Sequence, residues 1–222
     1  MTRGSCVTRL ASMIAALQRP HPARVALDGV DGAGKTHLAD ELVGPLSCSG
    51  RQIIRASIDG FHCPRAHRYK RGRESADGYF RDSFNYEQLR SQLLDPLGPG
   101  GSLRCRTAVF DYRIDRPTDM PLLTAAPDAI LLVDGVFLQV PQLAGAWDFI
   151  VWVDAPFETT VERAVRRDTA RGGEEEATRA AYAVRYVPGQ RLYLDSCHPK
   201  ISADVVFDNS DLDEPRLTPR SR

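Results

Sequence analysis

The segment Gly29–Thr36 constrains the fold of this chain more than any other part of the sequence. It reads Gly-Val-Asp-Gly-Ala-Gly-Lys-Thr and fits the pattern G-x-x-x-x-G-K-S/T. Arg24–Asp28 before it is typical of a short buried strand, and Thr36–Val43 after it is typical of an amphipathic helix. A strand, a glycine-rich loop and a helix in this order surround an anion with backbone N–H groups and a helix N-terminus. We therefore expect phosphate contacts from Gly29, Asp31, Gly32, Ala33, Gly34, Lys35 and Thr36.

Lysine is rare in this chain, and one of its few lysines lies inside this loop. Among 29 lysines and arginines, the lysines are Lys35, Lys70 and Lys200 alone. A compact ammonium, rather than a planar guanidinium, suits the space between the phosphates of a nucleotide. We expect Lys35 to contact the phosphates and to take part in catalysis. The alternative is a glycine-rich turn that binds no ligand.

The composition is that of a globular protein in a reducing compartment. The 222 residues are 42% hydrophobic and 26% charged, and the formal net charge is zero. A zero net charge argues against nucleic acid as a partner, and no apolar run reaches the roughly 20 residues of a membrane helix. The five cysteines include no C-x-x-C pair, and the histidines have no metal-binding spacing. This cysteine usage indicates the cytoplasm rather than a disulfide scaffold.

Five short apolar segments, each followed by an aspartate, indicate the strands of one sheet. They are Val25–Leu27, Ile53–Ile58, Ile130–Val133, Phe149–Val153 and Val205–Phe207. Their alternation with helical stretches predicts an α/β fold, the three-layer sandwich of P-loop proteins with a mainly parallel sheet. We expect a single domain over residues 1–222.

Four further segments are expected around this sheet. Residues 1–23 contain a helix, Thr8–Gln18, whose apolar side chains share one face. Residues 61–84 are expected to form a loop, and residues 157–195 to form a lid with the helix that follows it. The tail, residues 210–222, holds prolines and many charges, and we expect it to be frayed.

Aspartates end the predicted strands, and in parallel sheets ligands bind beyond the carboxyl ends of the strands. This arrangement places four acids near one edge: Asp28, Asp59, Asp134 and Asp154. Asp134 is expected to hold Mg²⁺ together with Thr36. Asp59 is expected to accept the proton of an attacking hydroxyl. The alternative for Asp59 and Asp134 is a turn-forming role before the glycine that follows each of them.

The predicted helix Phe157–Gly172 carries arginines at every fourth position, Arg163, Arg167 and Arg171, which therefore share one face. Beside a phosphate-binding loop, such arginines can close over a triphosphate and stabilise the transferring charge. Gly172 and Gly173 would then serve as the hinge of a lid. The alternative is a solvated face that contacts no ligand.

The segment 61–84 combines basic side chains with aromatic ones, among them Phe61, Tyr69 and Tyr79. Such a mixture can bind a small substrate, and it can also stack the bases of single-stranded nucleic acid. A third alternative is a solvated loop.

Together these motifs resemble the uridine kinase and phosphoribulokinase superfamily of P-loop kinases, over about Val25 to Asn209. The matching parts are Gly29–Thr36, Asp59–His62, Asp134-Gly135, the lid arginines and Ala203–Asn209. The resemblance implies ATP and Mg²⁺ as cofactors. It implies that Asp59 acts as base and approaches the metal ion, as Asp134 does. It also implies that Arg163, Arg167 and Arg171 approach the phosphates.

The resemblance constrains the acceptor less tightly. In uridine–cytidine kinases a Tyr-Asp segment followed shortly by a histidine reads the pyrimidine, whereas Val109–Arg116 here has no histidine. Asp59–Asn85 is similar to pantothenate kinases and fructokinase-like relatives as well. We expect an ATP-dependent kinase of a small-molecule hydroxyl, first the 5′-hydroxyl of a pyrimidine nucleoside, with pantothenate or a sugar as alternatives. The candidate acceptor contacts are Phe61, His62, Tyr79, Asp111 and Arg113.

Two other classes of protein share such a loop. A GTP-dependent switch commonly recognises guanine through N-K-x-D, which this sequence lacks. A nucleic-acid-binding ATPase depends on the basic segment 61–84 alone and is disfavoured by the zero net charge. A homo-oligomer is compatible with either class and with a kinase.

Overall fold

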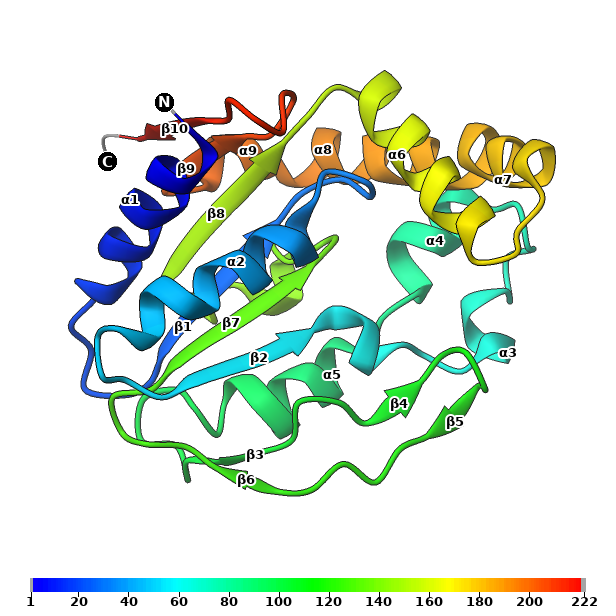
Figure 1. The fold of residues 1–222 in the computed structure, drawn as a ribbon. Coiled ribbons are helices and arrows are strands. Elements are labelled where there is room, and N and C mark those ends of the chain that lie inside the picture. Colours follow the sequence, from blue (N-terminus) through cyan, green and yellow to red (C-terminus); the bar gives the residue numbers. More distant parts are fainter. Residues whose placement is uncertain (1, 221–222) are drawn as a thin grey trace.

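One six-stranded sheet organises the structure, a computed structural model that describes residues 2–220 (Figure 1). Its strands are β1 (Ala23–Asp28), β2 (Ile53–Ser57), β7 (Ile130–Gly135), β8 (Phe149–Asp154), β9 (Val205–Asp208) and β10 (Arg216–Pro219). Their order is β10-β9-β8-β1-β7-β2, and all neighbours run parallel except β10, which is antiparallel to β9. The predicted α/β fold with a mainly parallel sheet is confirmed.

Helices flank this sheet. In chain order they are α1 (Arg3–Ala15), α2 (Lys35–Ser47), α3 (Arg65–Arg68), α4 (Ala76–Asp82), α5 (Tyr86–Leu89), α6 (Phe157–Ala170), α7 (Glu175–Ala181), α8 (Val187–Cys197) and α9 (Pro199–Ser202). Every residue of β1 and β7 is buried, as expected for a parallel sheet covered on both faces. In Figure 1, α2 lies across β1 and β7, and α1 packs beside α2. No helix within residues 2–220 is both long and apolar enough to cross a membrane.

Short elements complete the chain. Single helical turns are η1 (Ile58–Phe61) and η3 (Pro141–Leu143), and π-helical turns are η2 (Arg90–Leu94) and η4 (Tyr182–Tyr186). Two small ribbons pair β3 (Arg104–Cys105) with β6 (Leu123–Thr124), and β4 (Phe110–Asp111) with β5 (Arg116–Pro117). The turn η4 joins α7 to α8, so the segment after α6 is almost continuously helical.

The N-terminal helix and the segment 61–84 differ from expectation. Helix α1 begins at Arg3 rather than Thr8, because Thr2 caps its first turn by accepting from the N–H of Ser5. The prediction of a loop over 61–84 was wrong, since this segment contains α3 and α4. Ser75 accepts from the N–H of Gly78 at 2.9 Å and starts α4, a cap that the many arginines and glycines of the segment obscured.

The prediction of a frayed tail was also wrong over the part of the tail that the structure describes, and residues 221–222 lie outside the described residues. Residues 216–219 form β10, which pairs with β9 from Arg216↔Asp208 to Pro219↔Val205. The open edge of β9 offers unpaired backbone groups, and a neighbouring segment with little side-chain preference can satisfy them. Cys6 Sγ of α1 also contacts the carbonyl oxygen of Pro215 at 3.1 Å, which ties the tail to the N-terminal helix.

Asp148 holds the start of the central strand, and its replacement tests this part of the fold. It accepts from Arg24 N at 2.9 Å and from Arg24 Nε at 3.0 Å, and both side chains are buried. We expect Asp148→Asn to lower the free energy of unfolding by about 3 kcal/mol, because it leaves a buried guanidinium without its counter-charge. Urea unfolding of the two proteins at pH 7 measures this difference.

The pH dependence of that difference provides the control. Burial raises the pKa of Asp148, but hydrogen bonds from Arg24 outweigh burial and hold the pKa below its usual range. A carboxyl group with a lowered folded-state pKa stabilises the protein above its unfolded-state pKa and loses this effect as the pH falls through the folded-state pKa. The difference between wild type and variant should therefore shrink below about pH 4. A difference that does not change with pH would contradict this account.

Candidate active site

The glycine-rich loop joins the buried strand β1 to the N-terminus of α2. Gly32 and Gly34 have φ angles of +78° and +94°. A Cβ atom on Gly32 would lie 2.1 Å from the carbonyl oxygen of Thr160, and one on Gly34 would lie 2.5 Å from Asn209 Nδ2. Only glycine fits both the conformation and the space. The loop thus turns tightly enough to direct the N-terminus of α2 at an anion.

Lys35 is buried at the first position of α2. Its Nζ donates to the carbonyl oxygen of Val30 at 2.8 Å, which positions the ammonium group over the loop. Burial lowers the pKa of Lys35, an effect that the charges of nearby aspartates, Asp31 foremost, oppose. A cation held here can contact phosphate oxygens without first losing a large hydration shell.

Thr36 and Asp134 bring oxygen atoms together beside the loop. Thr36 Oγ1 donates to Asp134 Oδ2 at 2.6 Å, and Arg55 Nη2 donates to Asp134 Oδ1 at 3.1 Å. A hydroxyl and a carboxylate suit Mg²⁺, which keeps its other positions for water and phosphate oxygens. Within residues 2–220 no three His, Cys, Asp or Glu side chains cluster so as to hold a metal alone. The residues present fit a metal ion that phosphates help to bind.

Asp59 lies just beyond β2, in the turn η1, and its side chain is 56% exposed. His62 Nε2 is 3.5 Å from Asp59 Oδ1, while His62 Nδ1 is 3.0 Å from the carbonyl oxygen of Ser83. A carbonyl only accepts, so Nδ1 carries a proton and Nε2 faces the carboxylate. The imidazole also stacks on Phe84, with ring centroids 4.5 Å apart. An accessible carboxylate beside a fixed imidazole can accept a proton from a bound hydroxyl.

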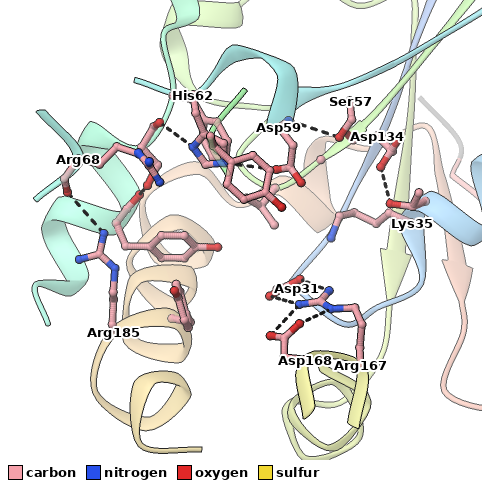
Figure 2. A pocket seen from close by; sticks show the side chains of 18 of the residues that line it. Asp31, Lys35, Ser57, Asp59, His62, Arg68, Asp134, Arg167, Asp168 and Arg185 are labelled. Carbon is pink, nitrogen blue, oxygen red and sulfur yellow. Dashed lines mark hydrogen bonds and ion pairs between the residues drawn. The ribbon is translucent and has the colours of Figure 1, made fainter. Parts of the chain in front are cut away.

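Asp31 of the loop binds Arg167 of α6, a contact that sequence reasoning did not anticipate. Arg167 Nη1 donates to Asp31 Oδ1 at 3.1 Å, and the hydroxyl of Tyr182 donates to Asp31 Oδ2. Burial raises the pKa of Asp31, but the charges of Arg167 and Lys35 outweigh it and leave this pKa below its usual range. Arg167 Nε also donates to Asp168 at 2.8 Å (Figure 2). Helix α6 is therefore tied to the glycine-rich loop through Arg167.

The other two arginines spaced by four residues along α6, Arg163 and Arg171, have different surroundings. Arg163 donates to the carbonyl oxygens of Asn209 and Ser210, each at 2.9 Å. Burial lowers its pKa, and the nearby charge of Arg3 lowers it further. Arg171, at the C-terminal end of α6, forms no ion pair with any residue that the structure describes. Of the three, only Arg167 forms ion pairs with described residues, since the hydrogen bonds of Arg163 go to neutral carbonyls.

Two cavities meet at the loop and share part of their walls. The first has a volume of about 370 Å³ and extends toward α3, α4 and η4, and the second has a volume of about 570 Å³ and extends over the N-terminus of α2. Both volumes are those of small-molecule sites. The residues that line both include Lys35, Thr36, Asp59, Arg167 and Arg171. Figure 2 shows the first cavity, with Lys35, Asp134 and Arg167 on one side and Arg68 and Arg185 on the opposite side.

The five candidate acceptor contacts are not all brought together. His62 and Tyr79 line the first cavity, and burial raises the pKa of Tyr79 well above its usual value. Arg113 lines the second cavity. Phe61 is fully buried in the core, and Asp111 lines neither cavity but accepts from the N–H of Arg113 at 2.9 Å.

The four strand-end acids also separate into two pairs. Asp59 and Asp134 line the first cavity. Asp28 is fully buried and accepts from Gln139 and Tyr193, and burial raises its pKa. Asp154 accepts from Lys200 Nζ at 2.6 Å on the surface. The position of these acids at the carboxyl edge of the sheet was predictable, but the loop after each strand decides which acid faces a cavity.

Several cavity or site residues were not singled out from the sequence, among them Arg55, Tyr182 and Arg185, and Arg68 is only one of several basic residues in the segment 61–84. Arg55 gave a signal, because an arginine inside the otherwise apolar strand β2 needs a partner, here Asp134. Tyr182 and Arg185 both lie in η4, inside the expected lid segment, and nothing in the local pattern distinguishes them from exposed neighbours.

Comparison with known proteins agrees with this geometry. The model of the phosphoribulokinase/uridine kinase family matches residues 25–212. No curated protein matches the chain. A possible uridine kinase from Bacillus stearothermophilus superposes with a TM-score of 0.72 at 23% identity, over 92% of this chain and 98% of that one.

Two further solved structures share the fold. A candidate fructose transport system kinase from a Silicibacter species has a TM-score of 0.67 at 21% identity, with 88% of this chain and 95% of that one covered. D-glycerate 3-kinase from Cryptococcus neoformans has a TM-score of 0.65 at 12% identity, with 96% and 99% covered. At these identities the likeness establishes the fold and leaves the acceptor undetermined.

Proposed function

We propose that this chain, which belongs to the phosphoribulokinase/uridine kinase family and is thus a P-loop kinase, transfers the γ-phosphoryl group of ATP to a hydroxyl of a small molecule. One observation carries the proposal: two cavities meet at a wall that contains Lys35, Thr36, Asp59 and Arg167. A donor in the cavity over α2 and an acceptor in the other would face each other across the loop. Transfer in line between two substrates requires this arrangement.

The residues of the chain divide the work of such a transfer. Asp59 takes the proton of the acceptor hydroxyl as that oxygen attacks phosphorus, and His62 lies beside the carboxylate, with its Nε2 3.5 Å from Asp59 Oδ1. Lys35 and Arg167 contact the phosphate oxygens and stabilise their charge. Thr36 and Asp134, with Asp59 nearby, would hold Mg²⁺, which supplies further charge neutralisation between the phosphates.

The acceptor is proposed as a class of hydroxyl compound rather than as one molecule. By sequence resemblance alone the 5′-hydroxyl of a pyrimidine nucleoside ranks first, with pantothenate and sugars as alternatives, and the charges that line the acceptor cavity distinguish among these classes. ATP consumption measured against nucleosides, pantothenate, sugars and their acid derivatives tests the function. Consumption that depends on one class of acceptor supports it, and ATP hydrolysis indifferent to every acceptor contradicts it.

A nucleic-acid-binding ATPase is the alternative from another class, and internal ion pairs weaken it. In the basic segment, Lys70 and Arg71 pair with Asp82 at 3.0 and 2.7 Å, and Arg81 pairs with Asp77 at 2.5 Å. These charges are partly neutralised within the protein and offer little to a phosphate backbone. Filter binding of single-stranded DNA across a salt series checks this, because phosphate-tracking proteins bind tightly at low salt and lose affinity steeply as salt rises.

Arg167→Ala tests the role of the lid. We expect kcat to fall by about 10²-fold, or roughly 3 kcal/mol, and the Kd for ATP to rise by less, because a charge contact that strengthens in the transition state affects the rate most. Single-turnover kinetics and ATP titration measure the two effects. Arg179→Ala is the matched control, since Arg179 pairs with Glu162 and Glu175 on the outer surface of the lid. An unchanged rate in Arg167→Ala would mean that this face of α6 is solvated and contacts no ligand.

A further inference from the structure

Arg68 is a buried cation on the wall of the first cavity. It ends α3, is only 8% exposed and lines the cavity on the side away from Lys35 (Figure 2). Its Nη2 donates to Asp115 Oδ1 at 3.2 Å, but its Nε is buried and has no hydrogen-bond partner among the described residues. Because this Nε has no exposed surface, an anion in the cavity would bind Arg68 through its terminal Nη groups, of which Nη2 also donates to Asp115.

Arg185 lies on the same wall and lacks a carboxylate partner. It belongs to η4, is 5% exposed and also lines the first cavity. Its guanidinium donates to the carbonyl oxygens of Arg73 and Ser75 at 2.8 and 3.1 Å, and it forms no ion pair within residues 2–220. Neutral carbonyls fix its position without balancing its charge. A buried charge without a counter-ion is costly, and an anion in the cavity would remove that cost.

The aromatic ring of Tyr69 connects the two arginines. The guanidinium of Arg185 lies 4.9 Å from its centroid and that of Arg68 lies 5.7 Å from it. Three of the four carboxylates that line the same cavity have other arginine partners, since Asp31 and Asp168 pair with Arg167 and Asp134 pairs with Arg55. The fourth, Asp59, lies beside His62. Asp115 balances the charge of Arg68, so the excess positive charge of this wall comes from Arg185, and the wall faces the reacting groups from across the cavity.

We infer that the acceptor carries an anionic group, a carboxylate or a phosphate, which Arg68 and Arg185 bind while its hydroxyl lies at Asp59. This inference rests on the proposed function, since it assigns the first cavity to the acceptor. Guanidinium groups bind carboxylates and phosphates through paired, charge-assisted hydrogen bonds, and a neutral nucleoside offers no such partner. The specificity of the cavity thus favours hydroxy acids and sugar phosphates over nucleosides.

Matched pairs of acceptors test this preference. The pairs are pantothenate against pantothenyl alcohol, D-glycerate against glycerol, and ribose 5-phosphate against ribose. We expect at least one anionic member to be phosphorylated with a kcat/KM at least about 10²-fold above that of its neutral partner, the effect of losing charged hydrogen bonds that leave buried donors unpaired. The carboxylate and phosphate pairs distinguish the two sources of the anion. Neutral members that react as well as the anionic ones, or uridine as the best acceptor, would overturn the inference.

Replacing the arginines separates binding from structure. Arg68→Gln should raise the KM for the preferred anionic acceptor at least about 10-fold and change kcat much less, while leaving the KM for its neutral partner within about 2-fold. Arg185→Gln should act in the same direction, and Arg185→Lys, which retains the charge, should recover part of the affinity. Arg73→Gln is the control, because Arg73 also lies over the ring of Tyr69, at 5.6 Å, but lines neither cavity. An equal loss for both members of a pair would mean that Arg68 is merely structural.

A binding measurement keeps this test independent of turnover. Wild-type protein should be stabilised against heat by pantothenate or inorganic phosphate more than Arg68→Gln is, whereas Arg73→Gln should respond like wild type. If no acceptor stimulates ATP consumption, the proposed function fails, and the thermal shift still decides whether Arg68 binds an anion. If acceptors are phosphorylated without regard to charge, the inference fails and the kinase function stands.

Discussion

Asp59→Asn is expected to lower kcat by about 10²–10⁴-fold while the affinity for ATP changes much less. The amide keeps the shape of the side chain but cannot accept the proton of the attacking hydroxyl. Asp59 is exposed to the cavity and its Oδ1 faces His62 Nε2, so the substitution removes one charge and leaves the surroundings in place. Steady-state kinetics with the best acceptor, beside ATP titration, measures the effect.

Asp77→Asn is the matched control for this substitution, because Asp77 is a half-exposed aspartate of α4 that lines neither cavity. It should leave kcat unchanged. If Asp59→Asn also leaves kcat unchanged and only lowers the melting temperature, Asp59 forms the turn before Gly60 and does not act as a base. In that case the assignment of the acceptor cavity would lose its main support.

Lys35→Ala is expected to reduce phosphoryl transfer by at least about 10²-fold without unfolding the protein, as the loss of a preorganised charge contact usually does. Lys35→Arg should also be poor, because the ammonium is buried against the carbonyl oxygen of Val30 and a planar guanidinium does not fit as a point charge there. Transfer rates and melting curves of both variants are the measurements.

Lys200→Ala serves as the control for the lysine variants, since Lys200 is half-exposed and pairs with Asp154 on the surface. Its rate should equal that of wild type. Near-wild-type turnover in Lys35→Ala or Lys35→Arg would remove the basis for a phosphate-binding role of the loop.

The fold followed closely from the sequence because its signals are local. The strands of the parallel sheet are short apolar runs ended by aspartate, and the loop Gly29–Thr36 fixes what lies between the first strand and its helix. Strand β10 could not be predicted in this way. Its residues, Arg216–Pro219, have no strand pattern, and they pair only because β9 presents an open edge in the folded protein.

The site residues that belong to a sequence motif could be predicted. Those whose role depends on burial in the folded protein could not. Lys35 and Asp59 stand out from their spacing, and both line the cavities. Arg68 and Arg185 look like any other arginines in a chain with few lysines. Their proposed role depends on α3 and η4 meeting at one wall of the cavity. That meeting requires contacts between segments more than 100 residues apart, such as the hydrogen bond from Arg185 to the carbonyl oxygen of Arg73.

Transfer of the labelled γ-phosphoryl group from ATP to an acceptor tests the central claim most directly. Wild-type protein, Asp59→Asn and Asp77→Asn are each incubated with γ-labelled ATP and the acceptor panel, and the labelled products are separated and identified. The account predicts a labelled phosphate ester of one acceptor class with wild type and Asp77→Asn, and at least about 10²-fold less with Asp59→Asn. Label that appears only as inorganic phosphate, at the same rate with and without every acceptor, would contradict it.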